Sequence, residues 1–513
     1  HKTQLKKEHI ANILKLLDEG STIPFIARYR KELTGGADDE TLRDFEEVYL
    51  SSKRLLERKE EISRLIAERS TLTQELINAI NAAQTLHLLE DIYRPFKEKK
   101  NSRASEAINK GLTPLADVLQ KAELSEEAFF LEAKKYLSNA VPTLEDAVQG
   151  AQDILAERYA EEPREREAIR NTMLRHGELT LKKSKEFKED GVYAKFIEKC
   201  EKVAFVPSHR YLAIMRGVHE KELSVKIVIE SERIIENMQK YKIPRNAKSS
   251  SKLLLEAYVD GLKRLLLPSL EREVHAILKE SADAESINTF GKNLSQLLLT
   301  PPLHKRTILG VDPAFVSGCK LALIDENGGY IVHDVIYPTE PRKDYEGAKK
   351  KVQKLLQNYQ INAVAIGNGT ASRETCEFFA QLNAEGLKLP YTVVSEAGAS
   401  VYSASKIASE EYPALDVTIR GALSIAQRLR DPMAALVKID PKSLGIGQYQ
   451  HDVDQKLLTK KLTDVTTDLV NRVGVDINSA SASLLSYVAG VSKSVAKNII
   501  EYRQAHGVFT SKA

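Results

Sequence analysis

Cysteine is scarce in this sequence of 513 residues. Its three cysteines, Cys200, Cys319 and Cys376, lie far apart and form neither a CxxC motif nor a Cys/His cluster. This spacing argues against a disulfide framework and against a structural zinc site. A reducing compartment is the natural place for such a chain, so we predict a cytoplasmic protein.

Long apolar runs and an excess of one charge are also missing. No stretch approaches the roughly 20 apolar residues of a membrane helix, and the start, HKTQLKKEHI, lacks the apolar core of a signal peptide. Lysine and arginine number 75 against 72 aspartate and glutamate residues, a net charge of +3. Any nucleic-acid surface must therefore be a local patch. Because no GxxxxGK[ST] motif is present, we expect no nucleotide cofactor, and we predict no membrane partner.

Helical periodicity dominates the first 300 residues. Apolar residues recur at helical spacing over residues 10–17, 41–69 and 252–280. Pro268 should kink or split the last of these helices, because proline removes a backbone donor and clashes with the preceding turn. A chain of this length should form three to five domains of roughly 100–200 residues each.

The pattern changes to α/β after Pro301-Pro302. An apolar run at 306–315 precedes two β-rich runs that flank Asn327-Gly328-Gly329, which is a hairpin signal. Helical and apolar segments then alternate as far as Leu429. Three hairpin-connected strands followed by crossover units are typical of the ribonuclease H-like fold, whereas a Rossmann domain alternates from its first strand.

Residues 480–505 predict two short helices joined by a tight turn at Gly490. We expect Ser494 to cap the second helix. The free N–H groups at the start of a helix and its dipole favour a phosphate oxygen, and Lys493 and Lys497 add positive charge there. Such contacts hold a backbone without reading bases, so binding should be tolerant of sequence and sensitive to salt.

This segment resembles the helix-hairpin-helix family, although its turn reads Gly490-Val491-Ser492 where the family usually has Gly-x-Gly. An ordinary helical hairpin with solvated lysines is the alternative interpretation. The candidate nucleic-acid-binding residues are Gly490, Val491, Ser492, Lys493 and Lys497.

Carboxylates follow two of the expected strands. In nucleases of the ribonuclease H-like fold, several carboxylates converge on two metal ions about 3.5–4 Å apart. Asp312 follows the first strand and Glu396 the last, while Glu374 lies inside a helix. Asn368 ends the strand between them, and Arg420 occupies the helix start where such nucleases carry an aspartate, so a metal would be repelled.

We therefore predict no catalytic residue and no metal here, with Asp312, Glu374 and Glu396 as vestigial candidates. Two alternatives stay open. The three carboxylates can serve a metal-dependent nuclease or junction resolvase, or Asp312 can be only a turn residue before Pro313.

Basic and aromatic residues alternate near the N-terminus. This mixture suits a nucleic-acid backbone with stacked bases. The interpretation that we favour is structural, with Pro24, Phe25 and Ile26 anchoring a turn between helices in the core. The basic and aromatic residues are Phe25, Arg28, Tyr29, Arg30 and Lys31.

Taken together, the whole chain resembles the bacterial Tex family of transcription accessory proteins. The resemblance implies a helical scaffold, a YqgF-type domain without known nuclease activity, a helix-hairpin-helix and an OB-fold RNA-binding domain beyond Ala513. Since the sequence also begins without Met, we expect it to be a piece of a longer protein. The stretches that carry the resemblance are 23–36, 206–217, 258–273, 309–322, 366–375, 396–405 and 440–453.

The resulting prediction is a multidomain, mainly α protein that binds RNA or DNA, is not an enzyme and acts as a monomer. RNA polymerase is a candidate partner, and a polymerase-binding scaffold is a further alternative. The predicted parts are an N-terminal helical domain (1–190), a central helical region (191–304), a YqgF or ribonuclease H-like domain (305–432), a helical linker (433–475) and a truncated helix-hairpin-helix (476–513).

Overall fold

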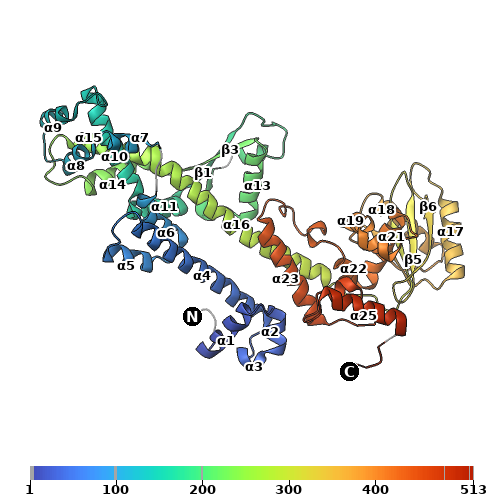
Figure 1. The fold of residues 1–513 in the computed structure, drawn as a ribbon. Coiled ribbons are helices and arrows are strands. Elements are labelled where there is room, and N and C mark those ends of the chain that lie inside the picture. Colours follow the sequence, from blue (N-terminus) through green and yellow to red (C-terminus); the bar gives the residue numbers. More distant parts are fainter. Residues whose placement is uncertain (1–4, 98–100, 198–199, 479, 508, 512–513) are drawn as a thin grey trace. The chain divides into compact units, whose positions relative to one another are not determined.

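The computed structural model describes residues 5–97, 101–197, 200–478, 480–507 and 509–511 (Figure 1). The chain forms two compact units. One joins the chain up to Arg43 with the part from Ala284 onward, and the other spans Asp44–Asp283. Helices make up most of both units, so the mainly α class is confirmed. None of the helices in the described part is long and apolar enough to cross a membrane.

The first unit contains a mixed five-stranded sheet. Its strand order is β6-β5-β4-β7-β8, in which β4 pairs antiparallel with β5 and parallel with β7. This is the predicted ribonuclease H-like arrangement. The sheet elements are β4 (Ile308–Asp312), β5 (Cys319–Ile324), β6 (Tyr330–Ile336), α17 (Tyr345–Asn358), β7 (Ala363–Gly367), α18 (Ser372–Ala384), β8 (Tyr391–Val394), α19 (Ala399–Ser403), α20 (Lys406–Glu411) and α21 (Val417–Arg430).

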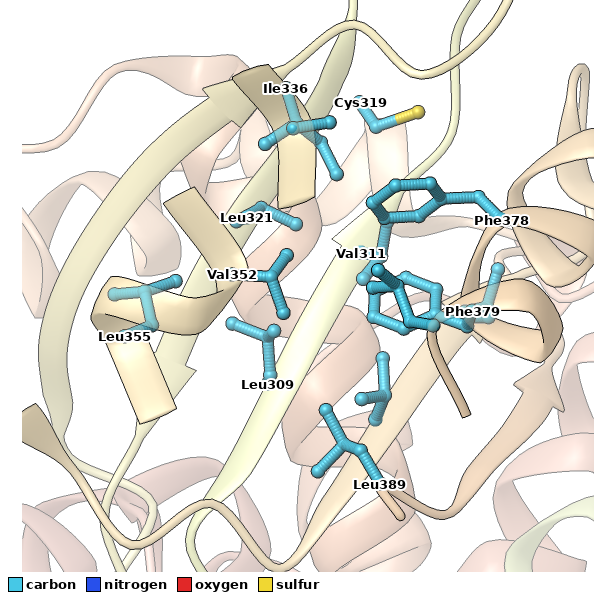
Figure 2. Packing of buried hydrophobic residues seen from close by; sticks show 14 of the residues in the cluster. Leu309, Val311, Cys319, Leu321, Ile336, Val352, Leu355, Phe378, Phe379 and Leu389 are labelled. Atoms are coloured by element: carbon cyan, nitrogen blue, oxygen red, sulfur yellow. The ribbon is translucent and has the colours of Figure 1, made fainter. Parts of the chain in front are cut away.

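Alternation along β4 divides its side chains between two cores, because successive residues of a strand point to opposite faces. Leu309 and Val311 join the cluster under α17 and α18, where Phe378 and Phe379 pack (Figure 2). Ile308 joins a second cluster with the apolar side of α21 on the other face. All but the last residue of β4 are buried, as expected for a central strand covered on both faces.

The remaining helices of this unit come from the N-terminal and the C-terminal parts of the chain. From the N-terminal part come α1 (Lys7–Asp18), α2 (Ile23–Tyr29), α3 (Lys31–Thr34) and the start of α4 (Asp39–Ala67). From the C-terminal part come the end of α16 (Leu267–Leu298), α22 (Pro432–Leu436), η5 (Pro441–Ser443), α23 (Gln455–Val473), α24 (Ala482–Leu485) and α25 (Lys493–His506).

The second unit is a helical assembly around the buried helix α10. That helix packs against α7, α8 and α15. The elements are the rest of α4, α5 (Gln74–Ala82), α6 (Leu86–Tyr93), η1 (Arg94–Phe96), α7 (Arg103–Asn109), α8 (Thr113–Lys121), α9 (Glu126–Ala133), η2 (Lys134–Tyr136), α10 (Leu144–Glu161), α11 (Pro163–His176), α12 (Ala194–Ile197), η3 (Val203–Phe205), α13 (Ser208–His219), α14 (Ser231–Tyr241), α15 (Ser251–Asp260) and α16.

The expectation of helix almost throughout was wrong in one place. A three-stranded antiparallel sheet of β1 (Glu178–Lys183), β2 (Glu201–Lys202) and β3 (Leu223–Val228) interrupts the second unit. Apolar residues do alternate in β1, at Leu179 and Leu181, and in β3, at Leu223, Val225 and Ile227, but each of these strands is only six residues long. The predicted interruption near Pro268 is confirmed: α15 passes into the π-helical turn η4 (Gly261–Leu266) before α16 begins.

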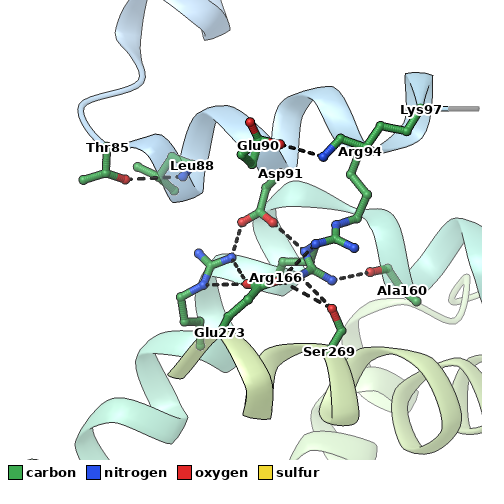
Figure 3. A network of polar contacts seen from close by, with 11 residues as sticks. Thr85, Leu88, Glu90, Asp91, Arg94, Lys97, Ala160, Arg166, Ser269 and Glu273 are labelled. Carbon is green, nitrogen blue, oxygen red and sulfur yellow. Dashed lines mark hydrogen bonds and ion pairs between the residues drawn. The ribbon is translucent and has the colours of Figure 1, made fainter. Parts of the chain in front are cut away.

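A buried ionic network joins α6, α11 and α16 in the second unit (Figure 3). Arg166, whose side chain is 1% exposed, donates through Nε to Asp91 Oδ1 at 2.6 Å and also contacts Glu273. Arg170 bridges the same two carboxylates. Arg94 Nη2 reaches Glu273 Oε1 at 2.9 Å. Since three guanidinium groups share two carboxylates, removing either carboxylate leaves buried positive charge.

Replacing Asp91 by alanine should therefore lower the free energy of unfolding by about 3–5 kcal/mol, because Arg166 and Arg170 lose a buried partner. The control is Asp117→Ala, which breaks the exposed ion pair with Arg158 at 2.7 Å and should cost less than about 1 kcal/mol. Urea denaturation followed by circular dichroism measures both. Equal and small losses would contradict the structural role of this network.

Candidate nucleic-acid interface and carboxylate pair

The predicted hairpin is present between α24 and α25. Gly490 has a φ of +85°, in the left-handed region that favours glycine, and a Cβ built there would meet no atom within 4 Å. The backbone of the turn is thus open to an approaching ligand. Ser492 adopts an extended conformation with φ −74° and ψ 164°, so the second position of the Gly-x-Gly pattern needs no glycine here.

Ser492, and not Ser494, caps helix α25, so the predicted cap was wrong by two residues. Its hydroxyl accepts from the N–H of Val495 at 3.3 Å, and Lys493 begins the helix. Ser494 lies inside the first turn, with its hydroxyl 2.8 Å from that of Ser492. Helix geometry leaves the N–H groups of Lys493 and Ser494 without an intrahelical acceptor, and both residues are exposed.

The two predicted lysines differ in their surroundings. Lys493 and Lys497 are both exposed on the first two turns of α25. Lys497 Nζ lies 3.5 Å from Glu501 one turn later, in a solvated ion pair. Among the described residues, Lys493 has no ion-pair partner within 4.0 Å. Positive charge at a helix start is unfavourable for the helix dipole, which makes Lys493 a residue placed at some cost to helix stability.

Asn471, at the end of α23, braces the turn and was missed by sequence reasoning. Its Oδ1 accepts from the N–H of Ala489 at 2.8 Å, and its Nδ2 donates to the carbonyl of Tyr487 at 2.7 Å. The side chain is almost fully buried. One amide thus fixes both sides of the turn that leads to Gly490. A single asparagine in a helical pattern gives no signal for such a role.

On the sheet, the structure brings together two of the three predicted carboxylates. Asp312 ends β4, and burial together with the charge of Glu396 raises its pKa from 3.8 to about 6, while Lys320 opposes the shift. Lys320 stands opposite Asp312 in the β4–β5 register and donates to the carbonyls of Ser317 and Gly318, each at 2.9 Å. The carboxylate of Glu396 lies over Gly367 and Gly369, where a side chain would collide with it.

The third candidate, Glu374, does not join this pair. It is exposed in the first turn of α18 and is not among the groups that shift the pKa of Asp312. Asn368 plays a structural part, since its Oδ1 accepts from the N–H of Glu396 at 3.0 Å and ties the end of β7 to the loop after β8. In the described part of the chain, no three His, Cys, Asp or Glu side chains are grouped to hold a metal ion.

Arg420 does not face Asp312, which corrects the sequence-based placement. Its guanidinium is buried and donates to the carbonyl of Tyr412 at 3.1 Å and to Ser409 Oγ at 2.9 Å. The residue of α21 that faces Asp312 is Gly421, where a built Cβ would be 3.0 Å from Asp312 Oδ2. The position opposite the first carboxylate therefore carries no side chain at all.

A second buried arginine, Arg428, also had no signal in the sequence. It is 4% exposed, and its Nη1 donates to the carbonyls of Ser395 and Ala397 at 2.6 and 2.8 Å. Burial lowers its pKa to about 10, and the nearby Glu396 partly offsets that effect. Arg428 therefore stays charged at neutral pH and holds the loop on either side of Glu396.

Models of known protein families match four stretches of the chain. The matching family models are the Tex-like protein N-terminal domain at residues 1–67, the Tex central region-like at 128–290, the Tex protein YqgF-like domain at 306–430 and the helix-hairpin-helix motif at 470–513. The uncharacterized protein YdcI of Bacillus subtilis is 45% identical over 513 residues, which cover 99% of this chain and 71% of YdcI.

The chain belongs to the Tex family.

Two further relatives carry descriptive names. The transcriptional accessory protein Tex of Neisseria gonorrhoeae is 40% identical over 97% of this chain and 66% of its own length. The human S1 RNA-binding domain-containing protein 1 is 37% identical over the whole of this chain and 53% of its own length. This Tex-family chain thus spans between about half and seven tenths of these relatives. The predicted family membership is confirmed.

The raised pKa of Asp312 predicts a pH effect on stability. Because the folded state binds this proton more tightly than the unfolded state, stability falls as the pH rises from about 4 through about 6. Asp312→Asn should therefore be more stable than the parent by about 3 kcal/mol at pH 8, and the gain should vanish near pH 4. Urea denaturation across this range measures it.

Asp416→Asn is the control for that experiment. Hydrogen bonds from Thr418 lower the pKa of Asp416 at the start of α21, so its replacement should give no gain at pH 8. A loss of stability in Asp312→Asn at pH 8 would show that the charged form of Asp312 is needed in the fold.

Proposed function

We propose that this Tex-family protein is a non-catalytic accessory factor of transcription that binds nucleic acid through the hairpin 487–497. The carrying observation is the open start of α25, where free N–H groups, the Gly490 turn and Lys493 face solvent together. A phosphate oxygen there receives backbone hydrogen bonds and lies at the positive end of the helix dipole.

The character of the binding follows from the groups on this surface. Backbone N–H groups and lysine ammonium groups recognise phosphate and carry no pattern that matches one base over another. The hairpin therefore holds a strand without selecting a sequence. Lys497 shares its charge with Glu501, so Lys493 should make the larger contribution to affinity.

The names of relatives support the same proposal. One is named a transcriptional accessory protein and another an S1 RNA-binding domain-containing protein. The helix-hairpin-helix match covers 470–513 and thus includes the whole hairpin together with Asn471. An RNA polymerase partner and a monomeric state stay predictions from the resemblance.

The non-catalytic part of the proposal rests on the YqgF-like sheet. Two-metal phosphoryl transfer needs several carboxylates around one point. Among the residues that the structure describes, only Asp312 and Glu396 converge, because Asn368 and Gly421 stand where further ligands are needed and Glu374 lies apart on α18.

Charge reversal at the hairpin tests the binding proposal. Lys493→Glu/Lys497→Glu should weaken binding of single- and double-stranded RNA and DNA at least tenfold at low salt. It should also reduce the slope of log affinity against log salt by about 1 to 2, one for each lost phosphate contact. Fluorescence anisotropy titrations at several salt concentrations measure both effects.

The matched control is Lys354→Glu/Lys406→Glu in the YqgF-like domain. Both lysines are exposed, and Lys406 forms the same kind of pair with Glu410, at 3.6 Å, that Lys497 forms with Glu501. The net charge changes equally in the two double variants. Equal losses of affinity in both would mean that only overall charge matters, and would sink the hairpin as the binding site.

Catalysis is tested separately. With Mg²⁺ or Mn²⁺ present, the parent chain should leave four-way DNA junctions and structured RNA intact, because the described carboxylates do not supply a two-metal site. Denaturing gel electrophoresis of labelled substrates gives the answer. Cleavage that disappears in Asp312→Asn would establish the nuclease alternative instead.

A further inference from the structure

Helix α2 has one buried and one exposed side. Ile23, Pro24, Ile26 and Ala27 are buried in the first unit, as the favoured structural interpretation of this segment expects. The opposite side carries the half-buried Phe25 and Tyr29, which is 54% exposed. The structural interpretation of this segment therefore holds for the buried face of the helix, and the nucleic-acid interpretation stays a prediction for the exposed face.

The exposed side carries a group of flat side chains, in which the planes of the Phe25 and Tyr29 rings are tilted by 43°. The rings of Phe25 and Tyr29 lie with centroids 5.3 Å apart, and the guanidinium of Arg30 lies 5.2 Å from the centroid of the Phe25 ring. Arg30 also donates to the carbonyl of Tyr29 at 3.0 Å. Flat aromatic and guanidinium surfaces held in place and open to solvent are the usual platform for an unpaired base.

Arg28 connects this platform to the hairpin. Its Nη2 donates to the backbone carbonyl of Asn471, the residue whose side chain braces Tyr487 and Ala489. Tyr29 follows Arg28 directly, so its Cα lies about 3.8 Å from that of Arg28. Asn471 therefore contacts both Arg28, next to the platform, and the turn that leads to Gly490, although Arg28 and Asn471 are 443 positions apart in the sequence.

Charges near Arg28 differ from those on the platform. Behind α2, Arg43 pairs with Asp464 at 3.0 Å and with Asp468, and Asp39 lies close enough to feel both Arg28 and Arg43. Three carboxylates therefore face two arginines here, and burial together with the charge of Asp468 raises the pKa of Asp39. On the platform, Arg30 and Lys31 are paired with no carboxylate within 4.0 Å in the part of the chain that the structure describes, and Glu32 is the adjacent acidic residue.

We propose that Phe25, Tyr29, Arg30 and Lys31 form a second subsite, which stacks an unpaired base of a single strand whose backbone is held by the hairpin. This inference rests on the proposed function and adds a preference for single strands. In a duplex the bases are already stacked on their neighbours, so only a single strand presents a free face to Tyr29. Arg30 and Lys31 lie beside it to contact the flanking phosphates.

The test compares Tyr29→Ala with the parent in the full chain, using oligo(U), oligo(dT) and a DNA duplex as probes. Tyr29→Ala should weaken binding of both single strands about tenfold, the usual effect of losing one stacked base, and leave duplex binding within about twofold. Tyr29→Phe should restore single-strand affinity, because the ring is kept. The two single-stranded probes show whether RNA or DNA uses the platform.

Tyr241→Ala is the matched control. Tyr241 is 70% exposed in the second unit and, like the platform, has a cation beside its ring, with Lys240 Nζ 5.1 Å from the centroid. Its loss should change no affinity. The double variant Arg30→Glu/Lys31→Glu is an independent test. It should lower the affinity for single strands and reduce the dependence of that affinity on salt.

The outcomes separate this inference from the proposed function. If Lys493→Glu/Lys497→Glu weakens binding while Tyr29→Ala does not, the hairpin binds nucleic acid and the platform is overturned. If Tyr29→Ala weakens single-strand and duplex binding equally, base stacking is overturned as well. If the parent binds none of the probes at low salt, the proposed function itself fails.

Discussion

Strand β4 can lie directly against helix α21 only because residue 310 has no side chain. A Cβ at Gly310 would be 2.1 Å from the carbonyl oxygen of Ala422 and 2.9 Å from the Cβ of Ala426. This close approach sets the height of α21 over the whole sheet. Asp312 lies two residues after Gly310 in β4, and the same close approach of α21 brings Gly421 against its carboxylate. Because Gly421 brings no side chain to this point, helix α21 adds no third ligand there to the carboxylate pair.

The two candidate sites of the first unit have opposite electrostatic character. Around Asp312 and Glu396 the groups are buried, and Lys320 and Arg428 are turned to backbone carbonyls that they hold in place. The hairpin instead exposes N–H groups and lysines that no carboxylate fully neutralises. In the proposed function, an anionic strand is attracted to the hairpin and not to the acidic pair.

Much of this arrangement could be predicted from the sequence, because it depends on local periodicity. Asn327-Gly328-Gly329 indicated the β5–β6 hairpin, and the order of elements along the chain indicated the strand order. The small sheet of β1, β2 and β3 was not predicted, since its strands are only two to six residues long and lie apart from one another between helices. Asn471 and Arg428 act through contacts with distant backbone groups, and no pattern in a single sequence reports such contacts. Ser492 caps α25 where Ser494 was expected, because two serines only two positions apart leave the exact start of a helix undecided in the sequence.

The division of the first unit between both ends of the chain has a consequence for how the protein is made. Residues of the second unit are contiguous in sequence, so all their partners are present once the ribosome has passed Asp283. Helices α1 to α3, in contrast, must wait for α23 and the hairpin, which are synthesised some 430 residues later. Since domains fold as units during synthesis, the middle of the chain folds first. The N-terminal helices therefore find their C-terminal partners only after the last part of the chain has been made.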